Sequence, residues 1–282
     1  MKAFLFLCAI TVVMTLSSCQ GGQPNQPELD IDAIKTVQDL NQAEQSLDES
    51  TKSVDADGTA DYARLAEKAL SLSRLLDAER LYQKSLWQNP ANPDRQASLT
   101  GLIQLYQDRL RYVQVAEMIC CSRQSADTTC CPKGEMNADS LQVLLRQEIV
   151  ADSTGEFSRQ GGRQYIAFSQ TYALLYPDRQ NSPAYLNEAA KLALSLRMPS
   201  KGIELYQWIY THFPASDAAP KARFLEGFTF ENELKDLEAA KAAYEAYLEQ
   251  YPQDVFAKDA RILLDNLGVD PEEMIRRFEN QQ

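Results

Sequence analysis

Two adjacent pairs of cysteines are the residues of this sequence whose types and spacing could most readily do chemistry. Cys120 and Cys121 are separated from Cys130 and Cys131 by eight mostly polar residues. Zinc binding is disfavoured, because adjacent cysteines point in diverging directions, unlike a CxxC pair, and no histidine lies nearby. A redox-active pair would have CxxC spacing at the start of a helix, which is absent. In an exported chain, four such cysteines favour structural disulfides.

The pairing of these cysteines stays open at the level of sequence, because four cysteines allow three connectivities. Nested pairing, of Cys120 with Cys131 and of Cys121 with Cys130, would close the loop that ends one helix and starts the next. Metal binding and free thiols are the alternatives to disulfides.

The remaining sequence offers no residues in a pattern typical of catalysis. His212 is the one histidine, near the end of an apolar helical segment, where we expect it to satisfy a carbonyl group. Glycine-rich phosphate loops, nucleophile elbows, paired zinc motifs and haem-attachment motifs are absent from the sequence. We therefore expect a protein that is not an enzyme and that needs no metal or cofactor.

The N-terminal residues predict export and lipidation. A positive start at Lys2 precedes the apolar run of residues 3–16, which is too short to cross a bilayer comfortably. This layout is typical of a signal peptide, here residues 1–18. The last residues of that segment, Leu16-Ser17-Ser18-Cys19, resemble a bacterial lipobox, which makes Cys19 the expected acylation site. The polar residues 19–28 then form a flexible tether.

A lipidated, exported chain has a predictable location. Acyl chains on Cys19 would hold it on a membrane, because each buried methylene contributes about 0.8 kcal/mol. We expect the bacterial cell envelope, and within it the outer membrane with the protein facing the periplasm. The formal net charge of -12 argues against nucleic acid as a partner.

Composition and periodicity predict an all-α body. Glycine and proline are sparse, at 11 and 12 residues, and the prolines fall mostly between apolar-periodic segments. Those segments are dominated by good helix formers such as Ala, Leu, Glu, Gln and Lys. Sustained alternation of the strand type is absent from the sequence.

An internal repeat organises the second half. When residues 183–216 are aligned with residues 221–254, large and small residues coincide, and a third segment beginning at Thr59 follows the same pattern. The coinciding pairs include Leu186 with Phe224, Gly202 with Ala240, Tyr206 with Tyr244, and Pro214 with Pro252. This spacing resembles the tetratricopeptide repeat, a helix-turn-helix unit of about 34 residues. The resemblance implies an α-solenoid of stacked helical hairpins, in which proline ends the second helix of each unit.

The whole chain can be divided on this basis. Residues 1–18 are the signal peptide, 19–28 the tether, 29–58 an N-terminal helix and linker, 59–126 helical pairs similar to the repeat, 127–182 the cysteine loop and a degenerate pair, 183–254 two repeat units, and 255–282 C-terminal capping helices.

A wider resemblance covers about residues 180–268. This region is similar to the Tol-Pal coordinator and outer-membrane assembly lipoprotein D families, which carry such repeats. The joints between units are held here by Phe213-Pro214-Ala215-Ser216 and Tyr251-Pro252-Gln253-Asp254. The resemblance implies a repeat fold and a role in the cell envelope. The first half departs from those families, especially in its cysteines.

Two functions fit these features. The first is a scaffold whose repeats bind envelope proteins along a concave face lined by the first helix of each unit. The polar residues expected on that face are Asn187, Lys191, Thr229 and Asn232. The second is a surface lipoprotein that binds glycans or peptides for nutrient uptake, which would need an exposed aromatic platform. We expect Trp87 and Trp208 to be used in packing, which favours the scaffold.

Overall fold

The computed structural model describes residues 29–51, 58–88, 95–122, 138–150 and 157–269. These ranges are helical apart from turns and one isolated bridge between Val150 and Phe157, which confirms the all-α prediction. The helices are α1 (Val37–Ser50), α2 (Thr59–Ser71), α3 (Leu75–Gln88), α4 (Arg95–Gln104), α5 (Val113–Ser122), α6 (Ala138–Gln147), α7 (Arg159–Leu175), α8 (Asn181–Ser195), α9 (Pro199–His212), α10 (Ala218–Thr229), α11 (Leu237–Gln250) and α12 (Ala257–Asp265). Single π-helical turns extend α4 through Leu105–Leu110 and α10 through Phe230–Leu234.

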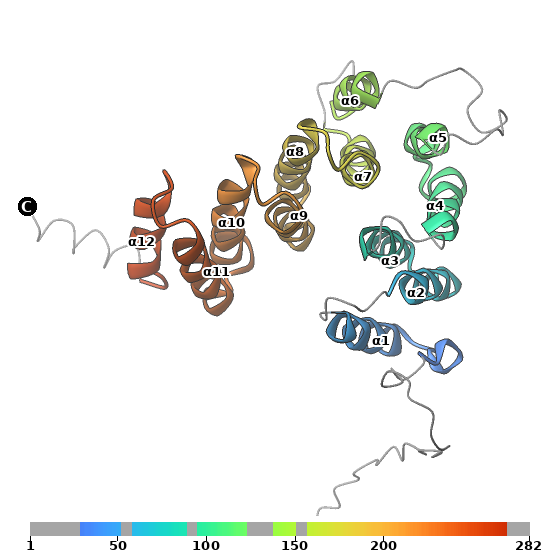
Figure 1. The fold of residues 1–282 in the computed structure, drawn as a ribbon, viewed down its shortest axis with the longest axis horizontal. Coiled ribbons are helices and arrows are strands. Elements are labelled where there is room, and N and C mark those ends of the chain that lie inside the picture. Colours follow the sequence, from blue (N-terminus) through green and yellow to red (C-terminus); the bar gives the residue numbers. More distant parts are fainter. Residues whose placement is uncertain (1–28, 52–57, 89–94, 123–137, 151–156, 270–282) are drawn as a thin grey trace, which may run out of the picture.

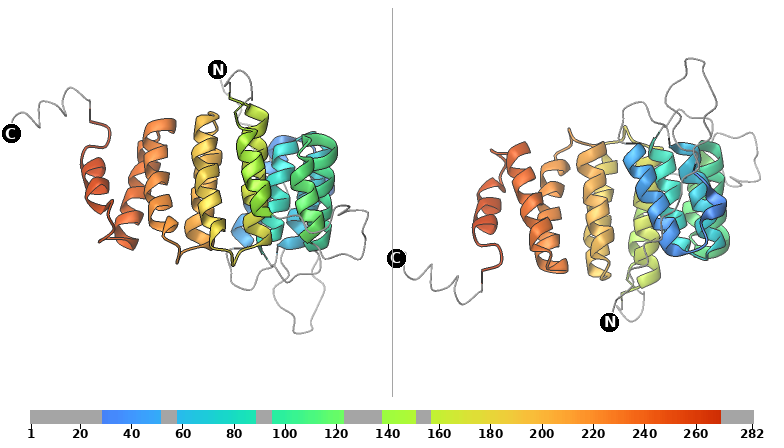
Figure 2. Two further views of the ribbon diagram at one scale, coloured as in Figure 1. Left: turned by 90° about the horizontal axis from the view of Figure 1, so that it is seen from above. Right: turned by 90° about the horizontal axis from the view of Figure 1, so that it is seen from below.

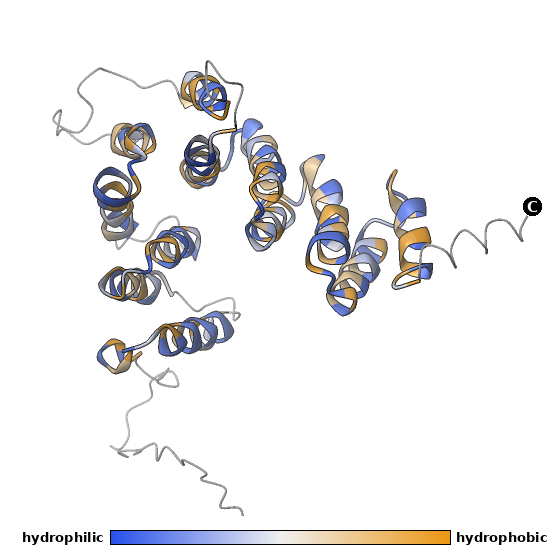
Figure 3. Cartoon of the chain, turned by 180° about the vertical axis from the view of Figure 1, so that it is seen from behind, coloured by the Kyte–Doolittle hydropathy of each residue, from blue (hydrophilic) through white to orange (hydrophobic). Residues whose placement is uncertain are grey.

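Most successive helices pack side by side, α5 packs on α7, and together the helices form one bent array (Figures 1 and 2). Helices α3, α7 and α9 lie on the inner side of the bend, whereas α2, α4, α5, α6 and α8 lie on its outer side (Figure 1). Hydrophobic residues gather where neighbouring helices face each other (Figure 3). The core therefore lies between helices along the array, in a larger cluster from Ile34 to Ala222 and a smaller one that begins at Phe224.

Four helical hairpins share the same tight turn. Each turn places one residue in the left-handed region, namely Ser73, Arg111, Arg197 or Lys235, with φ between 58° and 61°. The N–H of the next residue then donates back to a carbonyl near the end of the first helix, at 2.7–3.0 Å in all four turns. This bonding satisfies carbonyl groups that the end of a helix would otherwise leave unpaired. The interval from Ser73 to Arg111 equals that from Arg197 to Lys235, so the same spacing between turns occurs in both halves of the chain.

Three of the joints between hairpins also share one design. An aromatic residue followed by proline ends α7, α9 and α11, and its N–H donates to the carbonyl four residues earlier at 2.8–2.9 Å. The pairs are Tyr176-Pro177, Phe213-Pro214 and Tyr251-Pro252. Proline cannot continue the helix because it lacks an N–H and clashes with the preceding turn. The chain is thereby redirected at the same point in each hairpin.

Buried tyrosines tie several helices to a neighbouring segment. In five of the tyrosines that are at most 1% exposed, the hydroxyl donates to a carboxylate at 2.6–2.9 Å. The pairs are Tyr62 with Asp48, Tyr106 with Glu79, Tyr165 with Glu188, Tyr172 with Asp139, and Tyr244 with Glu231. A ring buried among apolar side chains with a bonded hydroxyl fixes both the depth and the rotation of its helix.

Candidate functional site

The structure places only some of the predicted site residues. Cys120 and Cys121 lie at the end of α5, and both are disulfide-bonded. Cys19, Cys130 and Cys131 lie outside the described residues. Lipidation at Cys19 and the nested pairing of the cysteines therefore stay predictions.

The four residues expected to line a concave face do not form one polar surface. Thr229 is only 1% exposed, and its hydroxyl donates to the Leu225 carbonyl at 2.7 Å. Asn187 and Lys191 belong to α8, which lies on the outer side of the bend (Figure 1). Asn232 is exposed, and its amide donates to the Phe228 carbonyl at 3.0 Å. The structure therefore does not place these four residues on one concave face, and their role in binding a partner stays a prediction.

The physical reason is the direction in which the array curves. The sequence pattern indicates which side chains are buried between helices, but curvature depends on a small rotation from each hairpin to the next. Here those rotations place α3, α7 and α9 on the inner side, and these helices were expected on the outer side as second helices of their pairs. The inner side is consequently the surface to search for a site.

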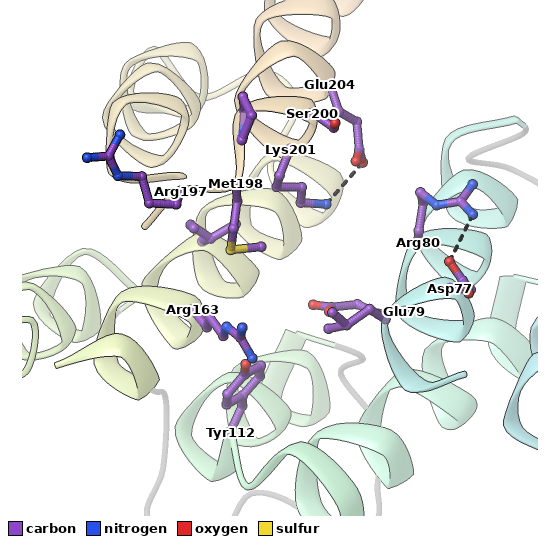
Figure 4. Close-up of a pocket in the computed structure, with 13 residues that line it drawn as sticks. Asp77, Glu79, Arg80, Tyr112, Arg163, Arg197, Met198, Ser200, Lys201 and Glu204 are labelled. Carbon is purple, nitrogen blue, oxygen red and sulfur yellow. Dashed lines mark hydrogen bonds and ion pairs between the residues drawn. The ribbon is translucent and has the colours of Figure 1, made fainter. Parts of the chain in front are cut away.

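A cavity of about 460 Å³ lies on this inner side (Figure 4). Its walls come from α3, α7, the first part of α9, the residue before α5 and the turn that joins α8 to α9. The lining residues are Leu76, Asp77, Glu79, Arg80, Tyr112, Arg163, Ile166, Arg197, Met198, Pro199, Ser200, Lys201 and Glu204. The bend brings these side chains together from distant parts of the sequence.

A buried acid forms part of the cavity wall. Glu79 is 8% exposed, and its carboxyl accepts a hydrogen bond from the Tyr106 hydroxyl at 2.9 Å. Tyr106 in turn accepts one from the Gln83 amide at 3.3 Å. Burial raises the pKa of Glu79, although the positive charges of Lys201 and Arg163 oppose the shift. This network joins Glu79, Tyr106 and the Gln83 amide nitrogen beside the cavity, and leaves the Gln83 Oε1 buried without a hydrogen-bond partner among the described residues.

Charged residues surround the opening above this network. Lys201 forms an ion pair with Glu204 at 3.0 Å, and Asp77 pairs with Arg80 at 3.3 Å. Arg163 and Arg197 form no ion pair within the described ranges. Figure 4 shows Arg163 beside Tyr112, facing the cavity, whereas Arg197 points away from it.

An aromatic cluster, formed by Trp87, Trp208 and His212, joins the ends of α3 and α9 and lines a second cavity of about 500 Å³. The Trp87 ring lies 5.2 Å from that of Trp208, between ring centroids, and stacks on His212 at 3.9 Å. Both tryptophans are therefore used in packing, as expected. His212 meets an aromatic ring instead of the carbonyl predicted for it, because the bend brings α3 against the end of α9.

Arg95 provides a second link across the bend. Its guanidinium donates to the carbonyl of Leu86, near the end of α3, at 2.9 Å and to that of Leu174, near the end of α7, at 3.0 Å. Charged donors make strong hydrogen bonds, and these two join segments far apart in the sequence. Neither this link nor the cavity could be found by inspecting motifs, since no local pattern signals either.

The described residues contain no group of three or more His, Cys, Asp or Glu side chains that could hold a metal ion. In the same part of the chain, no helix combines the length and the apolar character needed to cross a membrane. No protein-family model matches the sequence, and no curated protein matches it significantly.

The histidine provides a direct test of the contact between α3 and α9. Burial against the two tryptophans lowers the pKa of His212 to about 4, so we expect a neutral ring at pH 5 to 7. Titration by NMR is unambiguous because the chain has one histidine. Trp87→Ala should move this pKa back towards 6.5 by admitting water. A pKa near 6.5 in the unsubstituted protein would contradict the contact.

Proposed function

We propose that the protein is an α-solenoid of the tetratricopeptide-repeat type and a non-catalytic binding scaffold of the bacterial cell envelope, held on a membrane by lipid at Cys19. The recurrent left-handed turns and aromatic-proline joints support a repeat architecture. The lipobox-like sequence supports the lipid anchor. We place the protein at the outer membrane, on the side that faces the periplasm.

The cavity on the inner side of the bend is the observation that supports the proposed binding role. Three separate helices converge there and leave about 460 Å³ of space rimmed by charged side chains. Concave surfaces of curved helical arrays are where such proteins bind extended partners. We therefore place the partner, an envelope protein, along α3, α7 and α9.

The aromatic cluster bears on the alternative of glycan binding. A sugar platform needs an aromatic face that is open to solvent. Trp87 stacks on His212 and contacts Trp208, which is only 8% exposed. This arrangement favours protein docking over glycan capture.

Crosslinking in intact cells, followed by mass spectrometry, tests the position of the binding surface. Arg163→Glu reverses a charge on the inner side, and Lys191→Glu makes the same change on an exposed residue of α8 on the outer side. We expect the crosslinks made by the unsubstituted protein to be lost in the first variant and retained in the second. Equal loss in both, or loss in neither, would refute docking at this surface.

The anchor is tested separately by cell fractionation. Cys19→Ala removes the sulfur that would carry the lipid, so we expect the protein to move from the membrane pellet to the soluble fraction. Cys8→Ala, in the part of the signal that would be removed, serves as the control and should leave the mature protein in the pellet. Retention of the Cys19→Ala variant after a salt wash would show that something other than this lipid holds the protein.

A further inference from the structure

The carboxylates of the cavity have hydrogen-bond or ion-pair partners, but one arginine that faces it has no ion pair among the described residues. Each of its three carboxylates already has a donor: Asp77 bonds Arg74 at 2.6 Å, Glu79 accepts from Tyr106, and Glu204 bonds Lys201. Arg163 also faces the cavity, but it forms no ion pair within the described ranges, although the chain carries a net charge of -12. In the described part of the chain, the cavity thus has one cation facing it without an ion-pair partner, whereas each of its carboxylates already has a hydrogen-bond donor. This arrangement suits a negatively charged ligand.

The cavity also has an apolar part. Ile166 is buried, with 4% exposure, and Tyr112 is 3% exposed, so the side chain of Ile166 and the ring of Tyr112 form an apolar floor. Leu76 stands at the rim with 49% of its surface exposed, and Met198 and Pro199 complete the lining. Covering such a surface is favourable by about 25 cal/mol for each Å² removed from water. A ligand with an apolar body would gain this contribution.

We propose that this cavity binds a small organic acid with an apolar body. The carboxylate pairs with Arg163, whose planar guanidinium can donate two parallel hydrogen bonds to it. Lys201 has further N–H donors beyond its bond to Glu204 and lies in the same lining. The apolar body occupies the space between Leu76, Ile166 and Met198.

The size of the cavity agrees with a ligand of this class. Its volume of about 460 Å³ falls within the range of roughly 300–1,000 Å³ that small-molecule sites occupy. This inference goes beyond protein docking, because the ligand enters a cavity instead of covering a surface. The two ideas can therefore fail separately.

Isothermal titration calorimetry with matched probes tests the proposal on the mature chain. The probes are 4-phenylbutyrate, octanoate and indole-3-propionate, each compared with its uncharged amide. We expect at least one acid to bind, and its amide to bind at least tenfold more weakly because the amide cannot neutralise Arg163. Higher salt concentration should weaken binding of the acid and not of the amide.

Two variants locate the ligand. Arg163→Gln should weaken binding of the acid at least tenfold while leaving the amide unaffected, and Lys191→Gln on the outer side should change neither. Leu76→Gln removes part of the apolar wall and should weaken the acid and the amide alike. Both Arg163 and Leu76 are exposed, so circular dichroism and the melting temperature should stay unchanged.

Three results would overturn the proposal. They are equal binding of acid and amide, full affinity in Arg163→Gln, and failure of all three acids to bind. The last probe in the calorimetry experiment is a peptide that ends in leucine and has a free C-terminal carboxylate. Arg163-dependent binding of this peptide, without binding of the small acids, would refute the small-acid ligand while leaving protein docking at this surface intact.

Discussion

Tyr244→Ala is expected to unfold the C-terminal hairpin of the array. The Tyr244 ring is fully buried and packs over Gly227, where an added Cβ would lie 2.8 Å from the ring. Removing a buried aromatic side chain leaves a cavity that costs about 3–5 kcal/mol. This residue belongs to a separate small cluster with Phe224, Tyr247 and Ala260, which has little other core to compensate.

The separation of the two clusters predicts where the structure is lost. Hydrogen exchange should show lost protection in α10, α11 and α12, while α2 to α9 stay protected by the larger cluster. Tyr244→Phe is the control, since it removes only the hydroxyl bond to Glu231 and should cost about 0.5–1.5 kcal/mol. Loss of protection along the whole array would show instead that the chain unfolds as one unit.

Glu79→Gln is expected to stabilise the protein at neutral pH. Burial raises the pKa of Glu79 above its usual 4.5, so the folded protein holds this proton more tightly than the unfolded chain does. The contribution of Glu79 to the free energy of unfolding is therefore complete below pH 4.5. It falls as the pH rises towards the pKa of Glu79 in the folded protein. Glutamine stays neutral and can still accept the Tyr106 hydroxyl, so the variant avoids this loss. We expect a gain of about 1–3 kcal/mol, the usual cost of an incompletely compensated buried group.

Thermal unfolding between pH 3 and pH 8 measures this effect. The melting temperatures of the two proteins should converge below pH 4.5 and diverge above it, with the variant higher. Glu67→Gln, at an exposed position of α2, should show no such divergence. A Glu79→Gln variant that is less stable at pH 7 would show that the ionised carboxylate, paired electrostatically with Lys201 and Arg163, contributes favourably.

The sequence alone was sufficient to predict the helical class and the local packing. Leu186, Tyr206, Phe224 and Tyr244 occupy coinciding positions of large residues in the aligned repeats, and all four are at most 8% exposed. Such predictions succeed because helix propensity, proline stops and the spacing of small and large residues act over a few turns of one segment. The turn residues Ser73, Arg111, Arg197 and Lys235 escaped notice because their side chains carry no common signal.

The candidate site was decided by tertiary structure. Glu79, Arg163 and Lys201 belong to three helices, and they meet only because small rotations between successive hairpins add up to a bend. Those rotations depend on contacts across the whole array, such as Arg95 with Leu174 and Trp87 with His212, which no local pattern encodes. The sequence by itself thus determined which residues are helical and which are buried between adjacent helices. Only the packed array determined which side curves inward, and therefore which charged side chains share one cavity.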